Sequence, residues 1–264
     1  MFADQGTPVF VRLAAHPLRW RLLSELAASD RRVRELVELA GQPQNLISYH
    51  LRLLRGGGLV TANRSSFDAR DSYYHLDLES CAQTLRAVGL ALHPALRLAA
   101  TPPSATSSKR PVRPHVLFAC TGNSARSPIA EALLRHRAGG DVEVVSAGSH
   151  PKPRIHPNAA RVLREQYGID IADHRPRHLD TVARRQFDYV ITLCDLVREA
   201  CPEFSDQPRL IHWSIPDPAA NGTDRQTYPA FWRTAAEIET RIRYLLPVLT
   251  HTPEPESSCD NNTR

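Results

Sequence analysis

A cysteine followed six residues later by an arginine distinguishes the stretch Val116–Leu134, VLFACTGNSARSPIAEALL. An apolar, strand-like run ends at Cys120, and a helical pattern begins after the small polar residues around Arg126. Successive backbone N–H groups in such a turn, together with the dipole of the following helix, suit a tetrahedral oxyanion. Arg126 would bind two oxygens of that anion in bidentate fashion. We therefore expect an anion-binding loop that contains a nucleophilic thiol.

The other residues of the loop support the same chemistry. The positive surroundings should lower the pKa of Cys120, and a hydrogen bond from Ser127 should stabilise its thiolate. We expect Ser127 to cap the helix with Pro128 as the first helical residue, while Asn123 holds the loop through side chain–backbone bonds. Such a thiolate attacks the central atom of the bound anion. The alternative is a buried structural cysteine that precedes a phosphate-binding turn.

Alternating strands and helices should position this loop. The runs HVLFAC, VEVVSAG, YVITLC and RLIHWSI are rich in Val, Ile and Leu and predict strands. Between them, IAEALLRHR, NAARVLREQYG and LVREAC predict helices, and a long last helix should cover about residues 227–249. This alternation predicts an α/β domain whose parallel sheet is covered by helices on both faces.

The stretch CTGNSARSPIAEALL resembles the phosphate loop of low-molecular-weight protein tyrosine phosphatases and of the related thioredoxin-coupled arsenate reductases. The resemblance covers nearly all of residues 114–250 and implies a flavodoxin-like fold with a four-stranded parallel sheet. It implies that Cys120 is the nucleophile, Arg126 the oxyanion binder, and Asp217, in IPDPAA, the general acid. The implied oxyanion-binding loop consists of Thr121, Gly122, Asn123, Ser124, Ala125 and Arg126.

The segment LCDLVREAC resembles the redox pair of the reductases. The resemblance implies that Cys194 attacks the thiol-arsenate adduct and that Cys201 resolves the resulting disulfide. Seven residues of ideal helix span about 10.5 Å, whereas a disulfide needs Cα atoms within about 7 Å. A Cys194–Cys201 bridge therefore requires this helix to unwind. The alternative is two unrelated buried thiols.

Two further features bear on the choice between reductase and phosphatase. Phosphotyrosine phosphatases typically place aromatic residues after the Asp-Pro pair, whereas Ala219 and Ala220 follow it here, which favours a small inorganic anion. Some such reductases also bind potassium near the loop, and Asn123, Glu131 and Ser146 are the residues where its ligands would be. The alternative is an ordinary helix-surface glutamate and strand-end serine. No other cofactor is implied.

Residues 9–92 have a different pattern, which is helix, turn, helix and then a β-ribbon. They resemble the winged helix-turn-helix of the ArsR/SmtB repressors, and LISYHLRLLRGGGLV resembles the recognition helix and its exit into the wing. Such a helix lies in the major groove, and wing arginines contact phosphates. The implied DNA-binding residues are Asn45, Ser48, Tyr49, His50, Arg52, Arg64 and Arg70. The resemblance also implies a homodimer on a palindromic operator; a protein-contact module is the alternative.

Residues 9–92, called the front domain below, differ from the arsenite-sensing members of that family. Those repressors commonly carry two or three closely placed cysteines, whereas Cys81 is alone here. One subunit therefore cannot build a trigonal thiolate site for As(III) from it. Either the thiols of the back domain act as the sensor, or DNA binding is constitutive or answers to another signal.

Composition and charge set the outer bounds. The 264 residues suggest one large or two ordinary domains, and the formal charge of +5 is compatible with nucleic acid or oxyanion partners. We expect domains at 1–100 and 115–250, a Pro/Ser-rich linker at 101–114 and a disordered tail at 251–264 that holds Cys259. The sequence lacks a signal-peptide pattern and any apolar run of about 18 residues, so a cytoplasmic protein without a membrane partner is expected.

These observations favour a bifunctional protein, a transcriptional regulator fused to an arsenate reductase that acts through Cys120, Cys194 and Cys201. Thioredoxin or another thiol donor would recycle it. One alternative is a phosphatase fused to the DNA-binding domain, because Cys120, Arg126 and Asp217 suffice for ester hydrolysis. The other is a regulator whose back domain senses oxyanions without turnover.

Overall fold

The computed structural model describes residues 7–93, 96, 113–200, 208–220 and 222–250. The predictions for Cys201, for Cys259, for the tail and for most of the linker therefore lie outside the described residues. Within the described ranges, no helix has the length and apolar character needed to cross a membrane.

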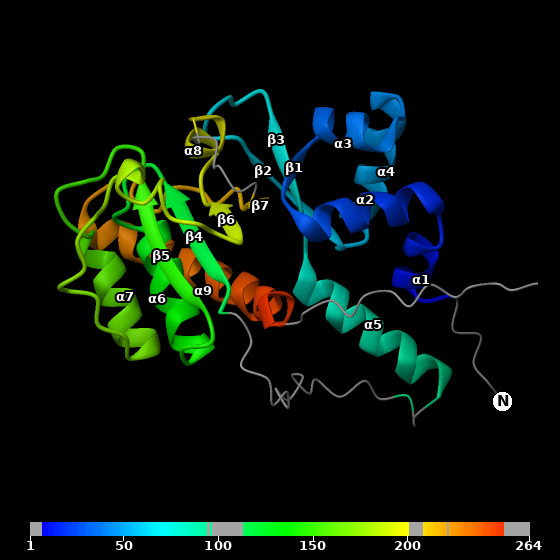
Figure 1. Ribbon diagram of the computed structural model, residues 1–264. Coiled ribbons are helices and arrows are strands. Elements are labelled where there is room, and N and C mark those ends of the chain that lie inside the picture. The colour runs from blue at the N-terminus through cyan, green and yellow to red at the C-terminus, as the bar shows by residue number, and fades with distance from the viewer. Residues whose placement is uncertain (1–6, 94–95, 97–112, 201–207, 221, 251–264) are drawn as a thin grey trace, which may run out of the picture.

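The N-terminal part forms a winged helix (Figure 1). Its helices pack around an apolar core that includes Leu36, Ile47 and Leu51, each with no exposed surface. Gly41 ends the helix before the recognition helix in the left-handed conformation, with φ 62°, as glycine readily does. A three-stranded sheet of order β1-β3-β2 forms the wing. The elements are α1 (Val9–Ala14), α2 (Pro17–Ala28), β1 (Arg31–Arg32), α3 (Val33–Ala40), α4 (Gln44–Gly56), β2 (Val60–Arg64), β3 (Ser72–Leu76) and α5 (Leu78–Leu92).

The C-terminal part is an α/β domain around a four-stranded parallel sheet of order β5-β4-β6-β7. The predicted flavodoxin-like class is confirmed, and the strands lie within the four predicted runs. The helices α6, α7 and α9 pack against one another, and α8 packs against β4 and β6. The elements are β4 (His115–Cys120), α6 (Arg126–Ala138), β5 (Glu143–Gly148), α7 (Pro157–Tyr167), the 3-10 helix η1 (Leu179–Thr181), β6 (Tyr189–Thr192), α8 (Asp195–Ala200), β7 (Arg209–His212) and α9 (Asp224–Thr250).

The strand order creates a crevice at one edge of this sheet. The chain runs from β4 to β5 on one side and then crosses to β6 on the other side of β4. In open parallel sheets, ligands bind beyond the carboxyl ends of the strands at such a reversal. Cys120 is the last residue of β4, and Cys194 follows β6 by two residues. The topology alone therefore brings the two cysteines to one crevice.

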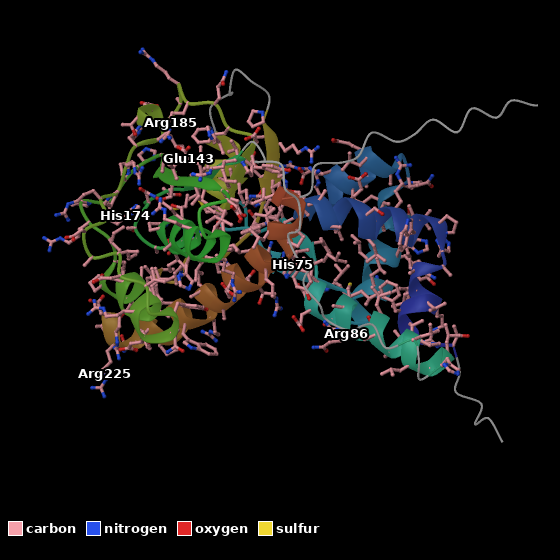
Figure 2. All side chains as sticks on the ribbon, turned by 60° about the horizontal axis from the view of Figure 1, so that its bottom comes forward. His75, Arg86, Glu143, His174, Arg185 and Arg225 are labelled. Atoms are coloured by element: carbon pink, nitrogen blue, oxygen red, sulfur yellow. The ribbon has the colours of Figure 1, made fainter. Side chains whose placement is uncertain are left out.

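The two domains are docked through a buried polar interface. Asp30, between α2 and β1, is 2% exposed; its backbone N–H donates to His212 O, and its carboxylate accepts from Ser214 N and pairs with Arg241. Tyr73 of β3 has no exposed surface, and its ring lies 4.7 Å from that of His212. The side-chain view places His75 where the two domains meet (Figure 2). The winged helix is thus packed on the α/β domain in addition to being tethered to it.

Candidate active site

Cys120 lies at the bottom of the crevice with only 2% of its surface exposed. Its Sγ is 2.9 Å from Ser127 Oγ. Asn123 Nδ2 donates to the same Ser127 oxygen at 3.0 Å, so the Ser127 hydroxyl proton is left to point at the sulfur. Ser127 is therefore oriented to donate a hydrogen bond to a thiolate on Cys120.

The loop after Cys120 owes its shape to Asn123. This residue adopts φ 42° and is, among the described residues, the one non-glycine with positive φ. Asparagine tolerates that region better than most residues, because its short polar side chain forms local hydrogen bonds. Its amide donates to Ser146 Oγ at 2.8 Å, and its Oδ1 accepts from Arg177 N at 2.7 Å. A side chain at Gly148 would meet Thr121 O at 2.5 Å, so only glycine lets the end of β5 approach the loop.

Arg126 begins α6 and turns its side chain toward the crevice. The expected cap is wrong: Ala125 occupies the N-cap position, and Pro128 is the third helical residue, where a missing N–H costs little. A cation at a helix N-terminus is unfavourable without an anion nearby. Asp217 supplies that anion: its Oδ2 lies 3.3 Å from Nη2 of Arg126. Arg126 also donates from Nη1 to Ile215 O at 2.9 Å.

The second cysteine faces the loop from the end of the neighbouring strand. Cys194 is 1% exposed, and its Sγ lies 3.3 Å from Thr121 Oγ1. The backbone before it is fixed by a hydrogen bond from Leu193 N to Ala119 O of β4, at 2.7 Å. Burial is the main cause of the raised pKa of Cys120, and Cys194 contributes to it electrostatically. Cys120 and Cys194 thus line one pocket.

The net pKa shift of Cys120 is opposite to the expectation. Burial raises the pKa of this thiol, while the charge of Arg126 and the hydrogen bond from Ser127 act to lower it. The predicted lowering of the Cys120 pKa is wrong in sign. The loss of hydration at this buried sulfur raises the pKa by more than Arg126 and Ser127 lower it. Attack by Cys120 should therefore become faster as pH rises.

The pocket has a volume of about 680 Å³ and a basic rim that the sequence did not reveal. His150, Lys152, Arg154 and His156, from the segment between β5 and α7, line it together with Arg126. They follow β5, the strand beside β4. Their position after the carboxyl end of a parallel strand could therefore have predicted that they line the pocket. Ser66 of the wing also lines the pocket, and no sequence pattern pointed to it.

The residues suggested for potassium do come together, but their donor set does not fit a cation. Asn123 presents its NH₂ group to Ser146, which in turn donates to Glu131 Oε2 at 2.6 Å. The Glu131 charge is balanced by Arg135 at 2.5 Å and Arg177 at 3.4 Å. Both guanidinium groups contact Glu131 Oε1, and Oε2 accepts from Ser146, so we interpret the cluster as a brace for the loop.

Most of the DNA-binding candidates lie on accessible positions of the winged helix. Asn45, Tyr49 and Arg52 of α4 are exposed, and so are Arg64 and Arg70 of the wing, while Ser48 is half-buried. His50 contradicts its prediction: it is 5% exposed, its ring lies 4.5 Å from that of His16, and burial lowers its pKa. It shares the buried face of α4 with Ile47 and Leu54, so it cannot reach a base edge.

Cys81 is a buried thiol of the front domain. It is 8% exposed within α5, and burial raises its pKa to about 11. A protonated, enclosed thiol is a poor ligand for a thiophilic ion. The described residues also hold no cluster of three or more His, Cys, Asp or Glu that could bind a metal ion.

A thiol in an anion loop, an arginine above it and a second thiol across the crevice define an enzyme site for a tetrahedral oxyanion. Residues 115–254 match the family described as low molecular weight phosphotyrosine protein phosphatase, and the chain belongs to that family. Residues 16–62 match the bacterial regulatory protein, arsR family, so the chain fuses the two.

Relatives of the back domain carry reductase names. The chain is 36% identical over 129 residues to an arsenate reductase of Halalkalibacterium halodurans and 34% identical to one of Bacillus subtilis. Each comparison covers 48% of this chain and 91% of the relative. Among solved structures, an arsenate reductase from Archaeoglobus fulgidus is 32% identical, with a TM-score of 0.42 over 50% of this chain and 98% of that one.

Proposed function

We propose that this protein is an arsenate reductase joined to an operator-binding winged helix. The observation that carries the proposal is the meeting of Cys120 and Cys194 in one basic pocket, from the ends of two adjacent strands. A phosphatase needs the first cysteine only, whereas the reduction of arsenate needs a second thiol that forms a disulfide with the first. The names of the relatives point the same way.

The proposed reaction starts with attack of the Cys120 thiolate on arsenic. Arg126 and the loop amides hold the oxyanion, and Asp217 protonates the departing oxygen, which leaves as water. Cys194 then attacks Cys120 Sγ: the S–S bond forms, the S–As bond breaks, and its electron pair reduces As(V) to As(III). Cys201 next attacks Cys194 and frees Cys120. An external dithiol such as thioredoxin reduces the Cys194–Cys201 bridge.

The pocket walls support a small inorganic substrate. No Phe, Tyr or Trp is among the described lining residues, and Ala219 lies beside Asp217 where a flanking ring would be needed for phosphotyrosine. Phosphate-ester hydrolysis remains the second candidate activity, because Asp217 lies 3.3 Å from Arg126, close enough to protonate an ester oxygen of a bound group.

A coupled assay tests the reductase. We expect NADPH consumption with arsenate, thioredoxin and thioredoxin reductase, and loss of that turnover in Cys194→Ser and Cys201→Ser. Hydrolysis of p-nitrophenyl phosphate by Cys194→Ser should stay near the wild-type rate. Equal loss of both activities in Cys194→Ser would contradict the relay. An absence of arsenate turnover together with ester hydrolysis would make the protein a phosphatase, and an absence of both would favour a sensor.

For the front domain, we propose operator binding as a homodimer through the exposed residues of α4 and the wing. Binding of the DNA upstream of the protein's own coding sequence can be followed by fluorescence anisotropy, with the oligomeric state measured by light scattering. Arsenite is added to wild type and to Cys81→Ser. Release in wild type alone would assign sensing to Cys81, release in both would assign it elsewhere, and no release in either would exclude arsenite as the inducer.

A further inference from the structure

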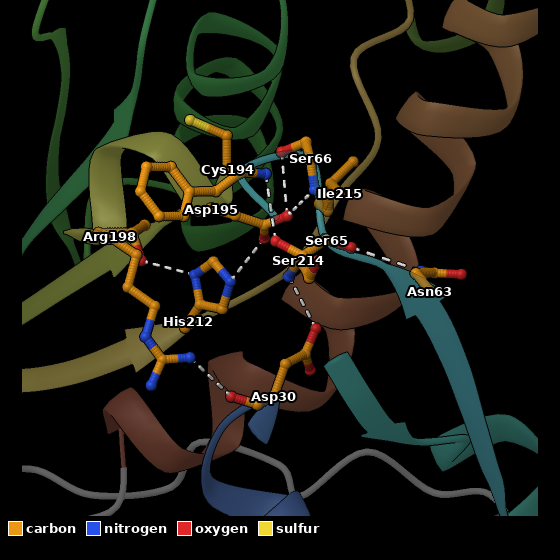
Figure 3. A network of polar contacts seen from close by, with 12 residues as sticks. Asp30, Asn63, Ser65, Ser66, Cys194, Asp195, Arg198, His212, Ser214 and Ile215 are labelled. Atoms are coloured by element: carbon orange, nitrogen blue, oxygen red, sulfur yellow. Dashed lines mark hydrogen bonds and ion pairs between the residues drawn. The ribbon is translucent and has the colours of Figure 1, made fainter. Parts of the chain in front are cut away.

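Helix α8, which starts directly after Cys194, bonds to the winged helix through residues at its start and in its second half. Asp195 accepts from the backbone and side chain of Ser66, at 2.5 and 2.9 Å (Figure 3). Arg198 donates to Asp30 O at 3.2 Å and pairs with Glu35. In addition, Glu199 pairs with Arg32 at 2.8 Å. Three of the six residues of α8 thus bond to the other domain.

Asp195 is buried, whereas its partner Ser66 is exposed. Asp195 is 2% exposed and accepts hydrogen bonds from Ser66, from His212 Nε2 at 3.0 Å and from Ser214 Oγ at 2.8 Å. Burial alone would raise the pKa of Asp195, but the hydrogen bonds from His212, Ser66 and Ser214 outweigh it and hold the pKa well below its usual range. The carboxylate is therefore charged at neutral pH, and the wing supplies two of its donors.

A helix as short as α8 has little stability of its own. Its six residues lie far below the roughly 12–15 residues at which isolated helices become even marginally stable. Its start fixes the backbone of Cys194, whose sulfur must align with Cys120 for a sulfur–sulfur bond to form. The residue that anchors this start from outside the catalytic domain is Ser66, which also lines the pocket.

We propose that Ser66 of the wing is a positioning residue of the thiol site, which holds Asp195 and thereby aims Cys194 at Cys120. The proposal rests on the thiol relay of the proposed function. It assigns the winged helix a role in the enzyme's second step only, because the loop of Cys120 makes its described hydrogen bonds within the α/β domain. The first step, attack by Cys120, should therefore not depend on Ser66.

Steady-state kinetics of Ser66→Ala test this role in the full-length protein. We expect kcat for arsenate to fall about tenfold, the scale of one hydrogen bond to a carboxylate, with KM for arsenate and hydrolysis of p-nitrophenyl phosphate unchanged. Ser66→Thr, which keeps the hydroxyl, should recover most of the rate. Asp68→Asn in the same wing loop, whose carboxylate accepts only from Arg70 N among the described contacts, serves as the control. An equal fall of both activities would mean a merely structural role and would overturn the proposal.

A measurement without arsenate separates this proposal from the proposed function. Hydrogen peroxide oxidises two thiols to a disulfide and is itself reduced to water, so the rate of Cys120–Cys194 bridging can be followed by mass spectrometry. We expect bridging to be slower by about the same tenfold in Ser66→Ala and normal in Asp68→Asn. A wild-type rate in Ser66→Ala overturns the positioning role, even where arsenate turnover is present. If wild type bridges its thiols without reducing arsenate, and Ser66→Ala bridges them about tenfold more slowly, the proposed function fails and the positioning role stands.

Discussion

The loop of Cys120 and the segment of Cys194 serve the same pocket, but they are held by different parts of the molecule. The loop is braced by Asn123, Ser127 and Ser146, which lie within 26 residues of Cys120 in the same domain. The helix after Cys194 is fixed by contacts across the domain boundary, such as Ser66 to Asp195, which are 129 residues apart. One half of the site is therefore local and self-contained, and the other half is held by contacts from both domains.

This difference separates two kinds of chemistry. Oxyanion binding and attack by Cys120 require the local half only. In the proposed relay, Cys194 forms the disulfide with Cys120, and the proposed positioning role of Ser66 makes its placement depend on the interface. A change at the interface should therefore affect reduction more than ester hydrolysis, and a change in the loop should affect both.

The largest expected effect comes from breaking the interface at Asp30. Asp30→Ala leaves the buried guanidinium of Arg241 without its main partner, which should lower the free energy of unfolding by about 3–5 kcal/mol. Urea denaturation followed by fluorescence measures the change. Below the transition, ester hydrolysis per folded molecule should persist while arsenate turnover falls. Asp180→Ala, which removes an exposed carboxylate, is the matched control; comparable destabilisation by the two would refute the interface's role.

A smaller effect is expected in the local half from Ser127→Ala. Burial raises the pKa of Cys120 and the Ser127 hydrogen bond opposes that rise, so losing the hydroxyl should raise the pKa further. The thiolate fraction at a given pH then falls, and the alkaline-rising limb of kcat/KM moves to higher pH for both activities. Rates at neutral pH should drop about tenfold, the scale of one hydrogen bond to a charged group.

Alkylation of Cys120 by iodoacetamide across a pH series gives the same pKa without substrate. Ser146→Ala serves as the control, because it removes a partner of Asn123 without touching the sulfur. A profile that stays in place in Ser127→Ala would show that the hydroxyl does not reach the thiolate. A profile that moves equally in both variants would assign the effect to loop shape.

The smallest effect is expected from Arg64→Ala in the wing. Arg64 is exposed and donates only to carbonyls of its own wing loop in the described structure, so its removal should not disturb the interface. Loss of one phosphate contact should weaken operator binding similarly for all sequences and reduce the salt slope by about one unit. Arsenate turnover should be unchanged. A slope that stays as in wild type would remove Arg64 from the DNA contact surface.

The sequence predicted the local half well and the interface hardly at all. A strand, a loop and a helix form a contiguous pattern, so Cys120, Arg126 and the α/β class could be read from nearby residues. The helix start was misplaced, because Pro128 fits the first turn at more than one position. The prediction for His50 is wrong because its spacing from Ile47 and Leu54 places it on the apolar, buried stripe of α4.

The contacts between the domains had no such pattern to reveal them. Ser66 is one serine in a polar hairpin loop, and Asp195 is an acidic residue at a helix start, where it is expected anyway. Their pairing depends on how two complete domains meet, and neither periodicity nor local spacing records that. The basic rim at His150 and Lys152 was predictable in part. The strand before these residues was predicted, but the extension of their loop into the pocket was not.

The pairing of Asp30 with Arg241 has a consequence for how the protein is made. The two residues are 211 positions apart, and the arginine lies in α9, the last helix of the described chain. During synthesis the winged helix emerges from the ribosome first, with the surface around Asp30 and Tyr73 still open to water. That surface can be covered only after almost the entire chain has been translated. The nascent winged helix therefore exposes the carboxylate of Asp30 and the ring of Tyr73 until the α/β domain has been made.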